Sequence, residues 1–318
     1  MFIGGAMKSI WTMGEMIVEI MRPRADMPHD EAGEYIGPFP SGAPAIMISA
    51  AARLGAMTGI IGGVGKDAFG DLILRRLNSY GVDCECVKRS DNGSTGNAFV
   101  MYHGDGAREF VFHIEGTPAV QAEIPPVEKL SNVGFFHIMG CSLTVSREYC
   151  KKIIRTAELA RTCGGKITFD PNIRTELLGD GNLQEIIRPI INNCSILLPG
   201  VDELLMISGK SNVTEAVEEL FQSAALEIIA LKNGSKGCRI YTRDGVLEVP
   251  AFPVEQKDAT GAGDCFDGAF LAAVLQGKDL RRAALEANAA GALNAAAFGP
   301  MEGDITPDHV SEFINGIN

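Results

Sequence analysis

The sequence predicts an α/β protein with a mainly parallel central sheet and a small projecting β-sheet. From residue 133 onward, strand and helix patterns alternate, which favours a parallel sheet covered by helices on both faces. Residues 95–114 contain two apolar runs around a glycine-containing turn, a pattern typical of a hairpin. The glycine-rich stretch KDATGAGD (257–264) leads directly into apolar residues at helical spacing, and it therefore predicts a loop that begins a helix.

Composition narrows the class of protein. The 318 residues are 46% hydrophobic and 21% charged, which is typical of a globular chain. The net charge of −12 argues against nucleic acid or anionic membranes as partners. Eight scattered cysteines form no CxxC pair, and the five histidines share no metal-like spacing, which favours buried, reduced thiols. No signal peptide and no membrane-spanning apolar run is evident, so we expect a cytoplasmic protein.

The first third of the chain combines strands with two helices. Residues 9–20 predict a strand, a glycine bend and a second strand. Residues 21–40 are polar and proline-broken, which suits a small projecting flap. An alanine-rich helix is expected in 41–55, and 58–70 predict a buried strand, a glycine turn and the start of another helix, which continues over 71–80.

The remaining elements follow the alternation. We expect the 95–114 hairpin to join residues 21–40 in one sheet. Beyond it, the patterns predict strands in VGFFHIMG, KITFDPN, SILLPG and EIIALKNG, and helices over 146–162, 183–192 and 214–225. A final small-residue helix precedes a Gly-Pro turn near the end of the chain. We found no internal repeat and no linker.

The glycine-rich turn suggests phosphoryl-transfer chemistry. Gly261 and Gly263 allow backbone N–H groups to point outward together at a helix start, which makes a site for an anion. Asp264 lies beside that site and could accept the proton of an attacking hydroxyl. The alternative interpretation is an ordinary helix cap after a glycine-rich loop.

DATGAGDCFDGAF resembles the C-terminal signature of the ribokinase family of sugar kinases, the phosphofructokinase-B-like group. The resemblance extends over roughly residues 8–315. It implies a ribokinase-like three-layer α/β/α fold with a mainly parallel central sheet and a small projecting β lid. It also implies that Asp264 is the catalytic base, that the amides of Gly261, Ala262 and Gly263 form an anion hole, and that Asp258 helps to hold a monovalent cation such as K⁺.

The resemblance also assigns the sugar side of the site. Glu19 stands where most members have the aspartate that binds sugar hydroxyls, although it could equally be a solvent-facing strand residue. Ser41 and Gly42 replace a Gly-Gly turn at which the sugar approaches the backbone, and Ile46 replaces an asparagine. Residues 58–70 resemble the N-terminal signature GxVGxDxFG, whose role in the family is largely structural, with its aspartate (Asp67) near the substrate side.

The lid is expected to cover the sugar. The boundaries implied are 7–20, 41–92 and 116–318 for the nucleotide- and sugar-binding core, and 21–40 with 93–115 for the lid. Its aromatic residues, of which Phe99 and Phe112 are the candidates for substrate contact, would shield the sugar from water or simply pack the sheet. In the family such lids often pair, which implies a homodimer formed through the lid.

The remaining matches concern nucleotide and metal. FDPNIR resembles the family's D-x-N-x-R segment, whose Arg174 would contact sugar or phosphate, and PGVDE offers Glu203 to organise Mg²⁺ through water, with Gly200 replacing an asparagine. The residues expected near ATP are Lys232, Gly234, Gly237, Gly261, Gly263 and Asn288. Without the resemblance, Arg174 would be interpreted as a surface salt-bridge residue and Glu203 as a first-turn helix acid.

These matches predict an ATP- and Mg²⁺-dependent kinase that phosphorylates a primary hydroxyl of a small free sugar. FDPNIRTELL and the hairpin resemble ketohexose kinases, acting on fructose or tagatose, more than ribokinases. Kinases of 2-keto-3-deoxygluconate and nucleoside kinases of the same fold remain alternatives. A catalytically silent sugar-binding or regulatory protein is a further alternative, whereas a nicotinamide-dependent oxidoreductase lacks its glycine fingerprint.

Overall fold

The computed structural model describes residues 7–173 and 183–316. The strands of its larger sheet lie in the order β13-β12-β11-β10-β9-β8-β1-β4-β5. Those from β11 to β5 pair in parallel, and β12 and β13 add an antiparallel edge. Their bounds are Ser9–Met13 (β1), Met57–Gly65 (β4), Val87–Ser90 (β5), Val133–Met139 (β8), Lys166–Asp170 (β9), Cys194–Leu197 (β10), Ile228–Lys232 (β11), Cys238–Thr242 (β12) and Gly245–Val249 (β13).

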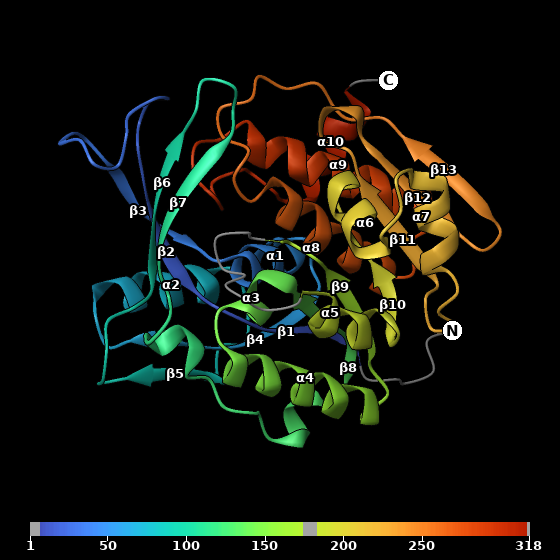
Figure 1. Ribbon diagram of the computed structural model, residues 1–318, viewed down its shortest axis with the longest axis horizontal. Coiled ribbons are helices and arrows are strands. Elements are labelled where there is room, and N and C mark those ends of the chain that lie inside the picture. Colours follow the sequence, from blue (N-terminus) through green and yellow to red (C-terminus); the bar gives the residue numbers. More distant parts are fainter. Residues whose placement is uncertain (1–6, 174–182, 317–318) are drawn as a thin grey trace.

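Helices cover both faces of this sheet (Figure 1). One buried cluster joins the sheet to α1 (Ala43–Arg53), α2 (Ala68–Ser79), α8 (Ala262–Leu275), α9 (Leu280–Ala295) and α10 (Pro307–Asn315). The other face packs against α3 (Gly140–Thr144), α4 (Arg147–Thr162), α5 (Leu183–Ile191), α6 (Val201–Ser208) and α7 (Val213–Leu220). The predicted three-layer arrangement is therefore confirmed. Among the described residues no helix is both long and apolar enough to cross a bilayer.

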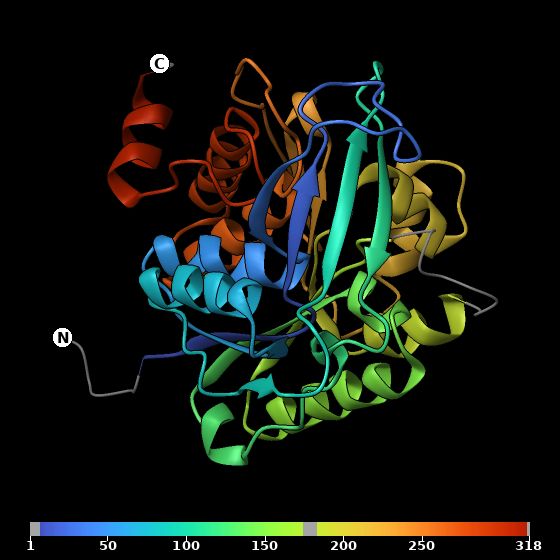
Figure 2. The same ribbon diagram turned by 90° about the vertical axis from the view of Figure 1, so that its left-hand side faces the viewer.

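The predicted hairpin and its partner strands form a second sheet in the order β3-β2-β6-β7. Its strands are Ile17–Met21 (β2), Ile36–Ser41 (β3), Asn97–Tyr102 (β6) and Arg108–His113 (β7). Figure 2 shows this sheet, called the lid below, projecting from the layered body. Residues 17–20, which the sequence interpretation placed in the core, lie in the lid because β2 pairs with β3 and β6.

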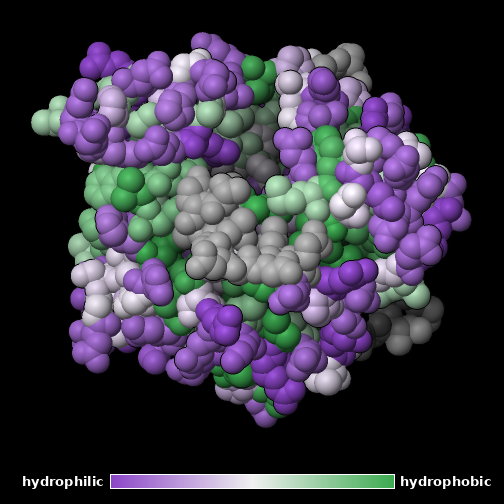
Figure 3. Space-filling view, in the orientation of Figure 1, coloured by the Kyte–Doolittle hydropathy of each residue, from purple (hydrophilic) through white to green (hydrophobic). Residues whose placement is uncertain are grey.

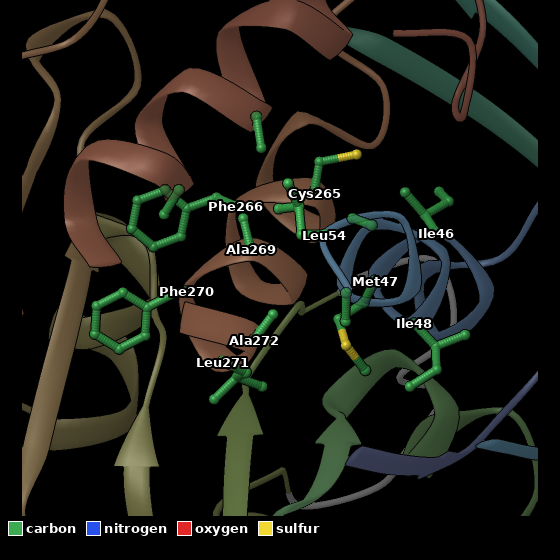
Figure 4. Packing of buried hydrophobic residues seen from close by; sticks show 14 of the residues in the cluster. Ile46, Met47, Ile48, Leu54, Cys265, Phe266, Ala269, Phe270, Leu271 and Ala272 are labelled. Carbon is green, nitrogen blue, oxygen red and sulfur yellow. The ribbon is translucent and has the colours of Figure 1, made fainter. Parts of the chain in front are cut away.

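Helix α8 lies directly against α1 because a glycine lets the two backbones approach. A Cβ added at Gly268 would lie 2.2 Å from the carbonyl oxygen of Met47 and 2.9 Å from the backbone nitrogen of Ala51. Figure 4 shows Ile46 and Met47 of α1 beside residues of α8 such as Cys265. The close contact fixes the position of α8 relative to α1. It therefore also fixes the position of the glycine-rich turn at which α8 begins.

We predict that Gly268→Ala lowers the melting temperature, because overpacking such a contact costs about 1–3 kcal/mol. Differential scanning fluorimetry measures the shift. Gly316→Ala is the matched control, since its added Cβ would meet only backbone oxygens, the nearest 3.3 Å away. Equal melting temperatures for Gly268→Ala and the unmodified protein would show that the two helices tolerate separation.

Candidate active site

The start of α8 forms a wall between two cavities. A small cavity of about 40 Å³ beneath the lid is lined by Gly261 and Asp264. A larger one of about 520 Å³ on the other side is lined by Ala262 and Gly263. Figure 3 shows the surface hollowed between the lid at the upper left and the C-terminal part at the upper right. One helical turn can therefore contact ligands in both cavities.

The turn itself requires glycine at its first position. Gly261 is the N-cap of α8, with φ at 75°. A Cβ there would lie 2.4 Å from the Pro300 carbonyl oxygen and 3.1 Å from Cγ2 of Ile46. First-turn amides lack intrahelical acceptors and, with the helix dipole, attract anions. Of the predicted anion-hole donors, the Ala262 N–H donates to the Ala259 carbonyl at 3.3 Å, so it is the least suited to the role.

Asp264 faces the small cavity rather than bulk solvent. The residue is 7% exposed, and its Oδ1 accepts a hydrogen bond of 2.9 Å from Nδ2 of Asn172. A carboxylate held in this way lies where a substrate under the lid could reach it, which is the geometry a general base needs.

The small cavity is acidic. Besides Asp264, it is lined by Glu19, as the resemblance implied, and by Glu15, which the sequence analysis did not single out. Glu19 accepts a 2.6 Å hydrogen bond from the Ser41 hydroxyl, and Glu15 accepts from the Cys141 thiol at 3.2 Å. The signal that could have found Glu15 is its place in the glycine bend between two predicted strands.

Gly42, which was predicted to lie beside the sugar, also lines the small cavity. Its φ is 103°, and an added Cβ would lie 2.5 Å from the Glu15 carbonyl oxygen. Ile46, which replaces the family's asparagine, lines the same cavity and supplies an apolar wall. Asp67 has a structural role, as expected for this segment, since it caps α2 through Gly70 and accepts from the Thr95 N–H at 2.7 Å.

The lid contributes aromatic side chains from one of its two faces. Phe110 and Phe112 stack with ring centroids 5.1 Å apart, and both line the small cavity. Phe99 is not among the described lining residues, because it pairs with Val111 and so lies on the opposite face of the hairpin, where its ring packs against Tyr35. Its predicted contact with substrate is therefore wrong, and it has a packing role.

Two lid side chains reach the loop before α8. The Tyr102 hydroxyl donates to Asp258 Oδ1 at 2.9 Å, and the Arg108 guanidinium donates to the Thr260 hydroxyl at 3.3 Å. Asp258 is buried and also accepts from the N–H groups of Thr260 and Gly299. Burial and the Asp258 charge raise the pKa of Tyr102 above its ordinary value, so the phenol remains a donor. Asp258 thus joins the lid to the turn.

We predict that Tyr102→Phe loosens the lid without unfolding the protein. A hydrogen bond to a charged group contributes about 1.5–3 kcal/mol, so kcat/KM for the sugar should fall about tenfold or more. Steady-state kinetics measures this, with Tyr80→Phe as the control away from both cavities. If both variants keep the kcat/KM of the unmodified enzyme, this contact does not hold the lid.

The large cavity collects the residues predicted to meet the nucleotide. Lys232, Gly234, Gly237 and Asn288 line it together with Gly263, beside apolar side chains. Nδ2 of Asn288 donates to the carbonyl oxygens of Val249, the last residue of β13, and of Pro250, at 3.2 and 3.0 Å, and so fixes the wall of the cavity. Its volume and mostly apolar lining suit a ligand of nucleotide size.

Lys232 lies at the inner end of that cavity in a cluster of buried acids. Its Nζ is 2.9 Å from Asp170 Oδ2 and 3.1 Å from both carboxylate oxygens of Asp267. Burial would lower the pKa of Lys232, but these two acids outweigh it and hold that pKa above its ordinary value. Burial raises the pKa of Asp267, whereas Lys232 outweighs burial at Asp170 and lowers its pKa. The lysine is therefore held in its charged form between two buried acids whose pKa values are shifted in opposite directions.

Glu203 is held by backbone donors. Its two oxygens accept from the Ile173 N–H at 2.9 Å and from the Gly200 N–H at 2.7 Å, so it caps α6. Burial and the Asp170 charge raise the pKa of Glu203. In the part of the chain that the structure describes, no group of three or more acidic, histidine or cysteine side chains is arranged to hold a metal. Arg174 lies outside the described residues.

A family model described as pfkB family carbohydrate kinase matches residues 7–307. The chain belongs to the pfkB family of carbohydrate kinases. Fructokinase-1 of Oryza sativa subsp. japonica is 31% identical over 311 residues, covering 94% of this chain and 95% of the relative. The fructokinase of Escherichia coli is 30% identical over 304 residues, covering 92% of this chain and 94% of the relative.

Solved structures of carbohydrate kinases confirm the ribokinase-like fold. A protein provisionally named ribokinase II from Escherichia coli superimposes with a TM-score of 0.92 at 36% identity, covering 97% of this chain and 99% of that one. A fructokinase from Vibrio cholerae O395 superimposes with a TM-score of 0.84 at 22% identity, covering 98% of this chain and 100% of that one. At this identity the likeness shows the fold alone. The wall formed by α8 is therefore part of a kinase fold that carries a lid.

Proposed function

We propose that this carbohydrate kinase transfers the γ-phosphoryl group of ATP to a primary hydroxyl of a free ketohexose such as fructose or tagatose. The observation that carries the proposal is the position of the first turn of α8, which lines a cavity on each side. Sugar bound under the lid and ATP bound in the large cavity would meet across that turn. The alternatives are a 2-keto-3-deoxygluconate kinase, a nucleoside kinase or a catalytically silent sugar-binding protein.

In this mechanism Asp264 accepts the proton of the attacking hydroxyl. The amides at the start of α8 stabilise the charge that develops on the transferred phosphoryl group. The aromatic rings of Phe110 and Phe112 exclude water from the sugar, which prevents transfer to water instead. Lys232, Gly234, Gly237 and Asn288 surround the nucleotide.

The acidity of the small cavity favours an uncharged sugar. Its described lining has three carboxylates, from Glu15, Glu19 and Asp264, and a single basic side chain, Arg108. Carboxylates accept hydrogen bonds from sugar hydroxyls but repel the carboxylate of a sugar acid. The names of the rice and Escherichia coli relatives agree with a ketohexose.

The cofactors of the proposed reaction are Mg²⁺ and K⁺. The Escherichia coli ribokinase II was solved with ATP and Mg²⁺, and the Vibrio cholerae fructokinase with fructose, ADP and potassium ion. Mg²⁺ would arrive with ATP and neutralise phosphate charge, and Glu203 would orient its waters while remaining fixed by two N–H groups. K⁺ would bind to oxygen atoms of the loop that contains Asp258 and hold that loop in place.

We also propose that residues 21–40 and 93–115, together with residues 17–20 of β2, act as a lid on the core, and that two lids pair in a homodimer. Ile36 and Val111 give the lid exposed apolar side chains that a second copy could cover. A cytoplasmic location fits the eight free cysteines.

Asp264→Asn should lower kcat about a hundred- to ten-thousand-fold while leaving sugar binding measurable. Removing a general base costs about a hundred- to ten-thousand-fold in rate, whereas the amide retains the shape of the side chain. ADP release measures the rate, and calorimetry measures sugar binding. A variant with near-normal kcat would rule out Asp264 as the base.

A substrate panel should rank free ketohexoses above 2-keto-3-deoxygluconate and above nucleosides in kcat/KM. Coupled ADP detection with each compound measures the ranking. A sugar acid at the top would mean that carboxylate recognition outweighs the acidic lining of the small cavity. If no ADP is released with any of the compounds, the result would instead support a catalytically silent sugar-binding protein.

A further inference from the structure

Asn172 combines a strained backbone with deep burial. It follows β9 with φ at 37°, a left-handed conformation that side chains other than glycine seldom adopt. The residue is 6% exposed, and its Oδ1 has no hydrogen-bond partner among the described residues. Such strain and such an unsatisfied atom are both unfavourable, and both are concentrated at functional sites.

The amide group of Asn172 lies between two carboxylates. Nδ2 donates to Asp264 Oδ1 at 2.9 Å and is 3.4 Å from Asp170 Oδ2, while the backbone N–H donates to Asp170 Oδ1 at 3.1 Å. Ionised carboxylates only accept hydrogen bonds, so this arrangement requires the NH₂ end of the amide, and not its oxygen, to face them.

The next contacts reach the nucleotide side. Asp170 is fixed by its 2.9 Å ion pair with Lys232. A Cβ added at Gly263 would lie 3.8 Å from the ammonium nitrogen of Lys232, so that cation lies beside the first turn of α8. Contacts therefore run from Lys232 on β11, through Asp170 on β9 and Asn172, to Asp264 on α8.

We propose that Asn172 is a positioning residue that orients the carboxylate of Asp264, and that the Lys232–Asp170 pair holds Asn172 in place for this task. The inference rests on the proposed role of Asp264 as base. By donating to Oδ1, Asn172 fixes the rotation of the carboxylate and its direction toward the sugar. Asn172 has no contact with substrate in this scheme and acts through Asp264.

A merely structural role predicts something different. If the chain needed only a left-handed residue after β9, glycine would serve better, since it adopts that conformation without strain. Asparagine instead brings a buried oxygen without a partner, which is unfavourable. The donor end of the amide explains why a residue with these disadvantages occupies the position.

The test compares Asn172→Gly with Asn172→Asp, both of which tolerate the left-handed backbone. Loss of a hydrogen bond to a charged group predicts that kcat falls about 10- to 100-fold in each variant. KM for sugar and for ATP should change by less than about threefold, because substrate contacts remain. In Asn172→Asp the acid limb of the pH–rate profile should also move to higher pH, because a second carboxylate would oppose ionisation of the base.

Asn212→Gly is the control, since it removes an asparagine that caps α7 far from both cavities. Its kcat should equal that of the unmodified enzyme. Near-normal kcat in Asn172→Gly, with an unchanged melting temperature, would overturn the inference and leave Asn172 as a turn residue. Asp264→Asn measured alongside separates the two proposals: if it stays active, the base assignment fails, and if it is inactive while Asn172→Gly is normal, only the positioning role fails.

Discussion

The close approach of α8 to its neighbours is the constraint on which the site depends. Gly268 lets α8 contact the backbone of α1, and Gly261 turns the chain beneath the Pro300 carbonyl oxygen. Neither contact leaves space for a Cβ, so the helix has little freedom to shift along its axis. Because catalysis by orientation is sensitive to displacements of about 1 Å, this packing matters for the catalytic role proposed for Asp264.

The electrostatics of the site follow from that position. Asp170, Asp264 and Asp267 are buried within one region of an acidic protein, where anionic substrates would be repelled. Lys232, which pairs with Asp170 and Asp267, offsets part of the negative charge that ATP would meet. In the proposed reaction, the positive end of the α8 dipole and the Mg²⁺ that arrives with ATP would relieve the remaining repulsion.

The sequence was sufficient for the layers, the hairpin and the helix that starts near Gly261, because each depends on local periodicity and turn chemistry. It could not show which face of the hairpin Phe99 occupies, since a shift of one residue in strand pairing reverses the faces. Nor could it place Glu15, or show that Lys232 pairs with Asp170, because those contacts join distant segments. Asn172 was visible only as part of a motif, and its role depends on a contact 92 residues away.

The most direct measurement is a crystal structure with fructose and a non-hydrolysable ATP analogue bound together. The account predicts a primary hydroxyl of the sugar within hydrogen-bond distance of Asp264, about 2.6–3.2 Å, and the terminal phosphate at the amides that begin α8. A sugar bound outside the cavity beneath the lid, or an Asp264 carboxylate turned away from both ligands, would contradict it.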